Sequence, residues 1–301
     1  MPDSARELCW RQFDAFATAG PYEQATAKLA LQPLINLGRL HTRDGHGNAA
    51  YRVHHSMFQA AKALTTASID GREVDLARVV RSGDDHQAVV QWLWTVLLAD
   101  GLRARCRAGR WSEVLAQAEQ HRGIGERLFD GRQIAIVAHS AVGDHAEALR
   151  LIDTTTASTV WEQTVAACLT VLCRTWAGQP ALSETAAMRE AYLRLEPDPG
   201  HTVFHIRLGL TAASLTSDAR DLRSIGRTIE RIVVEAADAY AAQDILALGG
   251  QLPLAEHSAS VLRETVRAAS LGTTVPPQLL DDLILAVRGA EQEIIAALHS
   301  C

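Results

Sequence analysis

The segment GRWSEVL occupies residues 109–115 and is followed 34 residues later by GDHAEAL at residues 143–149. GQPALS at residues 178–183 begins 35 residues after the second segment, and GPYEQA at residues 20–25 has the same layout. Two positions after each glycine stands a ring-bearing residue: Tyr22, Trp111, His145 or Pro180. Five positions after the glycine stands a small residue: Ala25, Val114, Ala148 or Ser183. Because a glycine can adopt the positive φ of a turn after a helix, and a small residue lets two helices pack closely, the motif predicts repeated helical hairpins.

The composition agrees with an all-α chain. Of the 301 residues, 48% are hydrophobic and only 5% are aromatic, and alanine is prominent, a balance that favours helices over sheets. Apolar residues recur at intervals of three and four in segments of about 12 to 22 residues. The segments are separated by loops of about two to six residues, which place consecutive helices antiparallel. We therefore expect an array of antiparallel helical hairpins.

The period of 34 residues, the turn glycine and the small residue five positions later resemble the tetratricopeptide repeat. The resemblance covers residues 3–31 and 88–195, with a looser helical continuation to residue 298. It implies an α-solenoid, a right-handed superhelix of helical hairpins in which the first helix of each pair lines a concave face. The proline that closes each repeat in that family is missing here.

A second resemblance is carried by WLWTVLLADG at residues 92–101 and RGIGERLFDGRQ at residues 122–133. These segments are similar to helical-repeat regions of actinobacterial regulators, especially those attached to a helix-turn-helix domain. The resemblance implies a regulatory role. Because the sequence shows no helix-turn-helix segment of its own, a DNA-binding role would require a separate chain.

We divide the chain into three regions that together form one continuous solenoid. Residues 1–85 are an N-terminal helical region with a hairpin-like ordered loop near residues 68–75, where an Asp-Gly pair separates two short alternating runs. Residues 86–200 carry the tetratricopeptide-like repeats. Residues 201–301 form a C-terminal helical region.

Motifs for catalysis and cofactor binding are missing from the sequence. The segment 123–128 lacks the third glycine and the lysine of phosphate-binding loops. His201 and His205 are spaced i, i+4, which places two imidazoles on one helix face, but the sequence provides no third zinc ligand. The cysteines form no Cys-x-x-Cys pair. We therefore expect no catalytic residue, no metal and no cofactor, and binding in preference to catalysis.

Charge and hydropathy restrict the partners. A net charge of −6 and a pI near 6.1 argue against direct nucleic-acid binding, which requires a positive field. No stretch approaches the roughly 18 uncharged apolar residues of a membrane span, and the first residues lack the apolar run of a signal peptide. Five scattered cysteines fit a reducing compartment. We expect a cytoplasmic protein that contacts neither a membrane nor nucleic acid.

The tetratricopeptide frame assigns the side chains that would line the concave groove. They come from three successive first helices: Arg103, Arg107, Asp130, Gln133, Val137, Cys168, Leu172 and Trp176. Arg103 and Arg107, spaced i, i+4, would hold a carboxylate or phosphate through forked hydrogen bonds, and Trp176 would supply a flat apolar anchor. The alternative interpretation is that both arginines form a solvated face and that Trp176 belongs to the core.

These observations favour a noncatalytic binding module. It would be a scaffold for a protein or peptide, or a ligand-sensing regulatory component that takes a small anionic ligand. The alternative is an all-α enzyme, or an accessory protein of a biosynthetic pathway, that encloses a small molecule inside the superhelix. Apolar residues at helical spacing in residues 254–269 and 277–298 also suggest a homodimer formed through the C-terminal helices.

Overall fold

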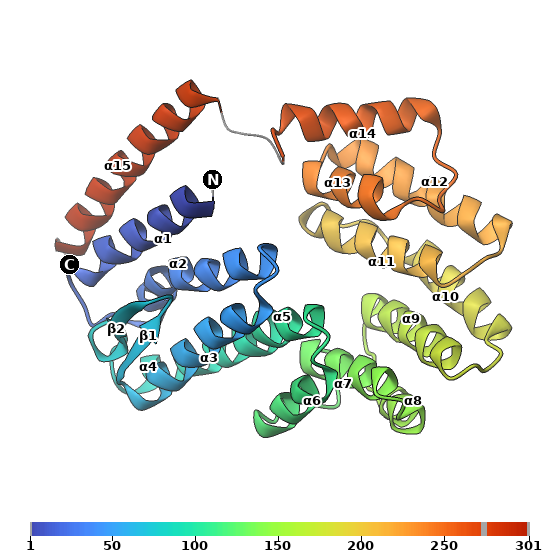
Figure 1. Cartoon of the computed structure of the whole chain (residues 1–301), viewed down its shortest axis with the longest axis horizontal. Coiled ribbons are helices and arrows are strands. Elements are labelled where there is room, and N and C mark those ends of the chain that lie inside the picture. Colours follow the sequence, from blue (N-terminus) through green and yellow to red (C-terminus); the bar gives the residue numbers. More distant parts are fainter. Residues whose placement is uncertain (1, 272–275, 300–301) are drawn as a thin grey trace. The chain divides into compact units, whose positions relative to one another are not determined.

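The computed structural model describes residues 2–271 and 276–299, and most of these residues lie in α-helices (Figure 1). The chain divides into two compact units, residues 1–124 with residues 275–301 and residues 125–274. In each unit, helices that are neighbours in the sequence pack against one another. The prediction of an all-α fold with helices packed in series, as in a solenoid, is therefore confirmed. The unit boundary falls inside the region 86–200, and the continuity of the solenoid across it stays a prediction.

The first unit begins with three helices and includes the last helix of the chain. α15 packs on α1, and Arg11 Nη2 lies 2.6 Å from Glu291 Oε2. The elements of this unit are α1 (Pro2–Ala17), α2 (Gln24–Arg43), α3 (Gly47–Ala63), β1 (Thr66–Ile69), β2 (Arg72–Asp75), η1 (Leu76–Arg78), α4 (Asp84–Val96), η2 (Leu97–Gly101), α5 (Leu102–Arg107), α6 (Trp111–Gln120) and α15 (Pro277–His299).

A two-stranded hairpin stands where the sequence predicts a hairpin-like loop. β1 and β2 pair antiparallel, and the turn between them places Asp70 and Gly71 at positive φ. The Asp70 carboxylate accepts a hydrogen bond from Arg6 of α1 and lies 2.7 Å from His41 Nε2 of α2. The hairpin is thus tied to two helices through one carboxylate.

The chain is helical without a break from Asp84 to Arg107. A π-helical turn, η2, lies between α4 and α5. A Cβ at Gly101 in this turn would lie 2.9 Å from Leu97 Cδ1 and 3.5 Å from His54 Cβ. The helix is thus wider at one turn, where its backbone approaches α3.

The second unit is a series of helical hairpins in which α7 pairs with α8, α9 with α10, α11 with α12 and α13 with α14. Consecutive hairpins touch because α7 packs on α9 and α11 packs on α13. The elements of this unit are α7 (Asp130–Ala141), α8 (His145–Asp153), α9 (Val160–Trp176), α10 (Leu182–Arg194), η3 (Pro199–His201), α11 (Thr202–Ser214), α12 (Ala219–Ala236), α13 (Ala239–Leu248) and α14 (Glu256–Ala268).

The repeat motif is confirmed at two of its four occurrences. Val114 and Ala148 are fully buried, and each is the fourth residue of its helix. Ala25 and Ser183 are exposed, so the prediction that these two small residues lie at the contact between paired helices is wrong. The helices α2 and α10 begin later relative to the motif, which makes these residues the second of their helices and turns them to another face. The motif glycines adopt positive φ at all four places: Gly20, Gly109, Gly143 and Gly178.

Candidate ligand pocket

A largely apolar pocket of about 680 Å³ lies within the second unit. It forms where the first residues of α9 and of α11 meet the connection between α10 and α11. The lining residues are Val160, Trp161, Arg194, Leu195, Glu196, Asp198, His201, Phe204 and His205. The volume is in the range of small-molecule sites, which are concave and mostly apolar with a few polar groups.

The start of α9 is fixed by a buried carboxylate. Glu162 has no exposed surface and accepts hydrogen bonds from the amide and hydroxyl of Thr159, at 3.0 and 2.9 Å, which completes a capping box. Arg127 Nη2 donates to the same carboxyl group at 2.9 Å. Burial alone would raise the pKa of Glu162, but the hydrogen bonds from Thr159, Arg127 and Ser158 outweigh it and lower the pKa to about 2. Val160 and Trp161 are therefore presented to the pocket by a firmly capped helix.

The connection before α11 is organised by Asp198. Its Oδ1 accepts a hydrogen bond from the Gly200 amide at 2.9 Å, and its Oδ2 lies 2.6 Å from His201 Nδ1. The His201 imidazole, followed by the Gly200 amide, holds the pKa of Asp198 below its usual range. The polar side of the pocket thus contains an exposed histidine–carboxylate pair next to Arg194 and Glu196.

The apolar side of the pocket is formed by rings. Trp161 and Phe204 meet edge to face, with ring centroids 6.0 Å apart and an interplanar angle of 87°. Phe204 is 40% exposed and the neighbouring Val160 is 52% exposed. Large apolar side chains that remain open to solvent inside a concavity indicate a surface that a ligand can cover.

His205 closes the pocket from the core side. The residue is only 3% exposed, and its Nε2 has no hydrogen-bond partner among the described residues. Its ring packs against the Tyr192 ring at 5.2 Å between centroids. Burial, with a smaller contribution from Arg231, lowers the pKa of His205, so the imidazole is neutral at pH 7. A neutral imidazole nitrogen can donate or accept one hydrogen bond, depending on its tautomer.

The i, i+4 pair His201 and His205 lies in this pocket, but its two members differ. His201 is exposed and paired with Asp198, whereas His205 is buried. Within residues 2–271 and 276–299, no group of three or more His, Cys, Asp and Glu side chains is placed to hold a metal ion. The two histidines therefore line one cavity in different states, one exposed and paired and the other buried.

None of the residues predicted to line the groove lines this pocket. Arg103 and Arg107 are exposed on α5 of the first unit. The other six lie on α7 and α9 of the second unit: Asp130, Gln133, Val137, Cys168, Leu172 and Trp176. A groove that joins all eight stays a prediction.

Within the second unit, the predicted groove residues differ in what they can offer a partner. Gln133 Nε2 donates to the Leu128 carbonyl at 2.8 Å, so this amide is engaged by the backbone. Cys168 is buried, and burial raises the pKa of its thiol to about 12. Trp176 is 46% exposed, so the interpretation of this residue as core is wrong.

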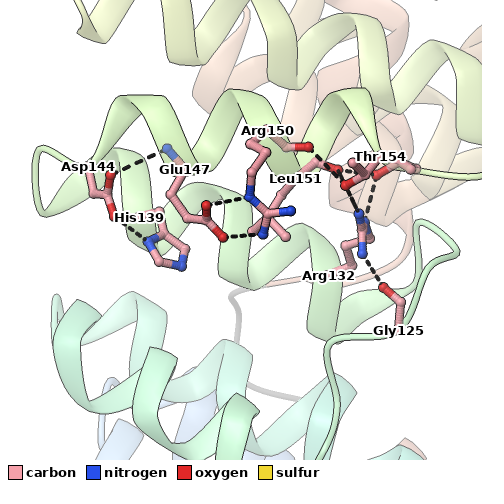
Figure 2. Close-up of polar contacts among 9 residues, drawn as sticks. Gly125, Arg132, His139, Asp144, Glu147, Arg150, Leu151 and Thr154 are labelled. Carbon is pink, nitrogen blue, oxygen red and sulfur yellow. Dashed lines mark hydrogen bonds and ion pairs between the residues drawn. The ribbon is translucent and has the colours of Figure 1, made fainter.

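A buried arginine at the start of α7 was not among the predicted residues. The guanidinium of Arg132 donates to the carbonyls of Gly125 and Leu151 and to the hydroxyls of Thr154 and Thr155 (Figure 2). Four of its five N–H groups are thereby used. The side chain joins α7 to the end of α8 and to the segment before α7, which is a structural role. No repeat motif marks this arginine in the sequence.

Comparison of the chain with protein-family models, with curated proteins and with solved structures finds no match. The function must therefore be inferred from the geometry of the chain itself. Of the helices in the described ranges, none combines the length and the apolar character that crossing a membrane requires.

Proposed function

We propose that the protein is a noncatalytic ligand-sensing module that binds a small, mostly apolar molecule in the pocket between α9 and α11. The observation that carries the proposal is the ring-lined cavity of about 680 Å³, with polar groups at one side and the buried His205 in its wall. Cavities of this kind enclose the apolar body of a ligand and orient it with a few polar groups, which Arg194 and His201 supply here. The ligand would thus have an apolar body and at least one hydrogen-bonding group.

The residues that line the pocket match a ligand with an apolar body and a polar group. The rings of Trp161 and Phe204, together with Leu195, would cover the apolar body. Arg194 and His201 at the polar side would accept an anionic or hydroxyl substituent. Because the lining comes from two successive hairpins and their connection, a bound molecule would fasten one hairpin to the next. Such a ligand-dependent contact is what a sensing component requires.

The second candidate is an all-α enzyme, and the His201–Asp198 pair is the observation that favours it. A carboxylate 2.6 Å from a histidine ring nitrogen can orient the ring as a general base. The lining, however, contains no Ser, Thr, Cys or Lys that such a base would activate. Binding without turnover therefore remains the better-supported function.

The test uses native mass spectrometry of the purified protein, together with titration by anilinonaphthalene sulfonate, an apolar dye with one anionic group. Val160→Trp fills the pocket from an exposed position, so the fold is preserved. Val142→Trp is the matched control because Val142 is 48% exposed and does not line the pocket. We expect Val160→Trp to remove any noncovalent adduct and to weaken dye binding by about tenfold or more, and Val142→Trp to change neither. Equal dye binding by both variants would contradict the proposal.

A further inference from the structure

Arginines form a stripe along α12. Arg220, Arg223, Arg227 and Arg231 follow one another at intervals of three and four residues, which places them on one face of the helix, and all four are exposed. The opposite face is apolar and buried, and it contains Ile225, Ile229, Ile232 and Val233. Packing of that face leaves the arginine stripe directed to solvent.

The neighbouring helix α10 adds to the positive charge. α10 packs on α12, and a shallow pocket of about 510 Å³ lies over the two helices. We call its lining residues the arginine surface: Arg189, Glu190, Leu193, Arg194, Arg220, Ser224 and Arg227. Four guanidinium groups and one carboxylate thus share a small area of a chain whose net charge is −6.

The protein itself neutralises only part of this charge. Arg189 is held by the buried Asp221, at 2.8 Å between Nη1 and Oδ1, and lies 3.3 Å from Glu190. Among the described residues, no carboxylate lies within ion-pair distance of Arg194, Arg220 or Arg227, and Asp218 interacts with Arg220 only at longer range. Like charges that are only partly neutralised repel one another, and an anionic partner would reduce this repulsion.

We propose that the arginine surface, which shares Arg194 with the ligand pocket, is a docking site for an acidic segment of a partner protein. Guanidinium groups bind carboxylates through paired, charge-assisted hydrogen bonds. Arginines on successive turns are about 4.5–6 Å apart along the helix axis, a spacing that carboxylates three or four residues apart on an acidic helix match. Leu193, which is exposed within the arginine surface, offers contact to an apolar residue of the segment.

The lining argues for a protein segment over nucleic acid. No aromatic ring lines the arginine surface, so bases of a single strand would find no stacking platform there. The negative charge of the whole chain also opposes a long polyanion more strongly than a short acidic segment. A short acidic helix with one apolar residue satisfies both conditions.

The experiment measures fluorescence anisotropy of a labelled synthetic amphipathic helix that carries glutamates on one face and a leucine between them. Arg220→Gln with Arg227→Gln should weaken binding by about tenfold or more, and added salt should weaken binding to the wild type. Arg263→Gln with Arg267→Gln is the control, because it removes the same charge from exposed positions on α14. Dye binding in the ligand pocket verifies that both double variants are folded.

Two outcomes would overturn the proposal. One is equal peptide affinity for the two double variants, which would show that binding depends on the net charge of the protein and not on the arginine surface. The other is binding of a labelled oligouridylate in preference to the acidic peptide, which would make the arginine surface a nucleic-acid site. Loss of peptide binding in the α12 variant alone supports the proposal.

Discussion

Two buried histidines, one in each unit, have unpartnered ring nitrogens but occupy very different surroundings. His54 in α3 is 2% exposed, and neither of its ring nitrogens has a hydrogen-bond partner among the described residues. His205 in α11 is 3% exposed and lacks a partner at Nε2. His205 lines a cavity of about 680 Å³, whereas His54 lines none of the pockets described above. The difference teaches that a buried histidine belongs to a candidate ligand site only where its residue lines a cavity.

The packing around His54 explains why it belongs to the core. A Cβ on Gly38 of α2 would overlap the His54 ring, and Gly101 of the π-helical turn approaches the His54 Cβ. Burial lowers the pKa of His54 to about 4, while Asp100 raises it and Arg39 lowers it by smaller amounts. The imidazole is thus held neutral between two glycines, with no room for a ligand.

The largest effect on stability is expected at Arg132, a third buried polar residue. Arg132 differs from His54 and His205 because its polar groups have hydrogen-bond partners. Arg132→Met keeps the apolar stem but leaves the Gly125 carbonyl without its donor and removes the hydrogen bond to the Leu151 carbonyl (Figure 2). We expect the free energy of unfolding to fall by about 3–5 kcal/mol, measured by urea denaturation.

The control for this variant lies in the same close-up. Arg150→Met removes an ion pair with Glu147 in which both groups are at the surface, and surface pairs contribute about 0–1 kcal/mol (Figure 2). Equal losses for the two variants would contradict the structural role of Arg132. A small loss for Arg150→Met and a large one for Arg132→Met would show how much a fully partnered buried cation contributes.

The next effect concerns the pH dependence of the first unit. Because the pKa of His54 is about 4 in the folded chain and 6.5 in an exposed histidine, the unfolded chain binds the proton first as the pH falls. The contribution of neutral His54 is therefore complete above pH 6.5 and is lost as the pH falls toward 4, by about 3 kcal/mol. Urea denaturation at both ends of this window measures the loss.

The matched variant for this prediction is His54→Leu, which fills a similar volume and cannot be protonated. We expect it to lose less stability than the wild type over the same pH window. If the wild type and the variant lose the same free energy, the neutral His54 is not the source of the acid sensitivity. Such a result would also contradict the description of His54 as a neutral core residue, on which the comparison with His205 depends.

The fold could be predicted from the sequence further than the site could. The helical periodicity and the turn glycines specify paired helices, because these signals are local and recur along the chain. The prediction for Ala25 and Ser183 is wrong because the residue at which a helix starts depends on capping and tertiary packing. A start two residues later turns the side chain to another face of the helix. The pocket joins residues of α9 with residues of α11 about 40 positions later, a proximity that no local pattern encodes.

One part of the site did leave a signal in the sequence. The i, i+4 spacing of His201 and His205 indicated two imidazoles close together, and both residues line the pocket, but spacing alone does not report burial. Only the structure distinguishes the exposed His201, engaged by Asp198, from the buried and unpartnered His205. The cavity that His205 lines, more than the pairing, is what points to a ligand.

The smallest expected effect on stability is also the sharpest test of the comparison. His205→Leu removes an unpartnered nitrogen from the core, so we expect the free energy of unfolding to change by less than about 1 kcal/mol while binding of the native adduct is lost. Tyr192→Phe is the control, because it removes an unpartnered hydroxyl beside His205 that does not line the pocket, and it should leave the adduct in place. Native mass spectrometry and urea denaturation provide the two readouts. A large destabilisation by His205→Leu, or loss of the adduct in Tyr192→Phe as well, would make His205 a core residue like His54.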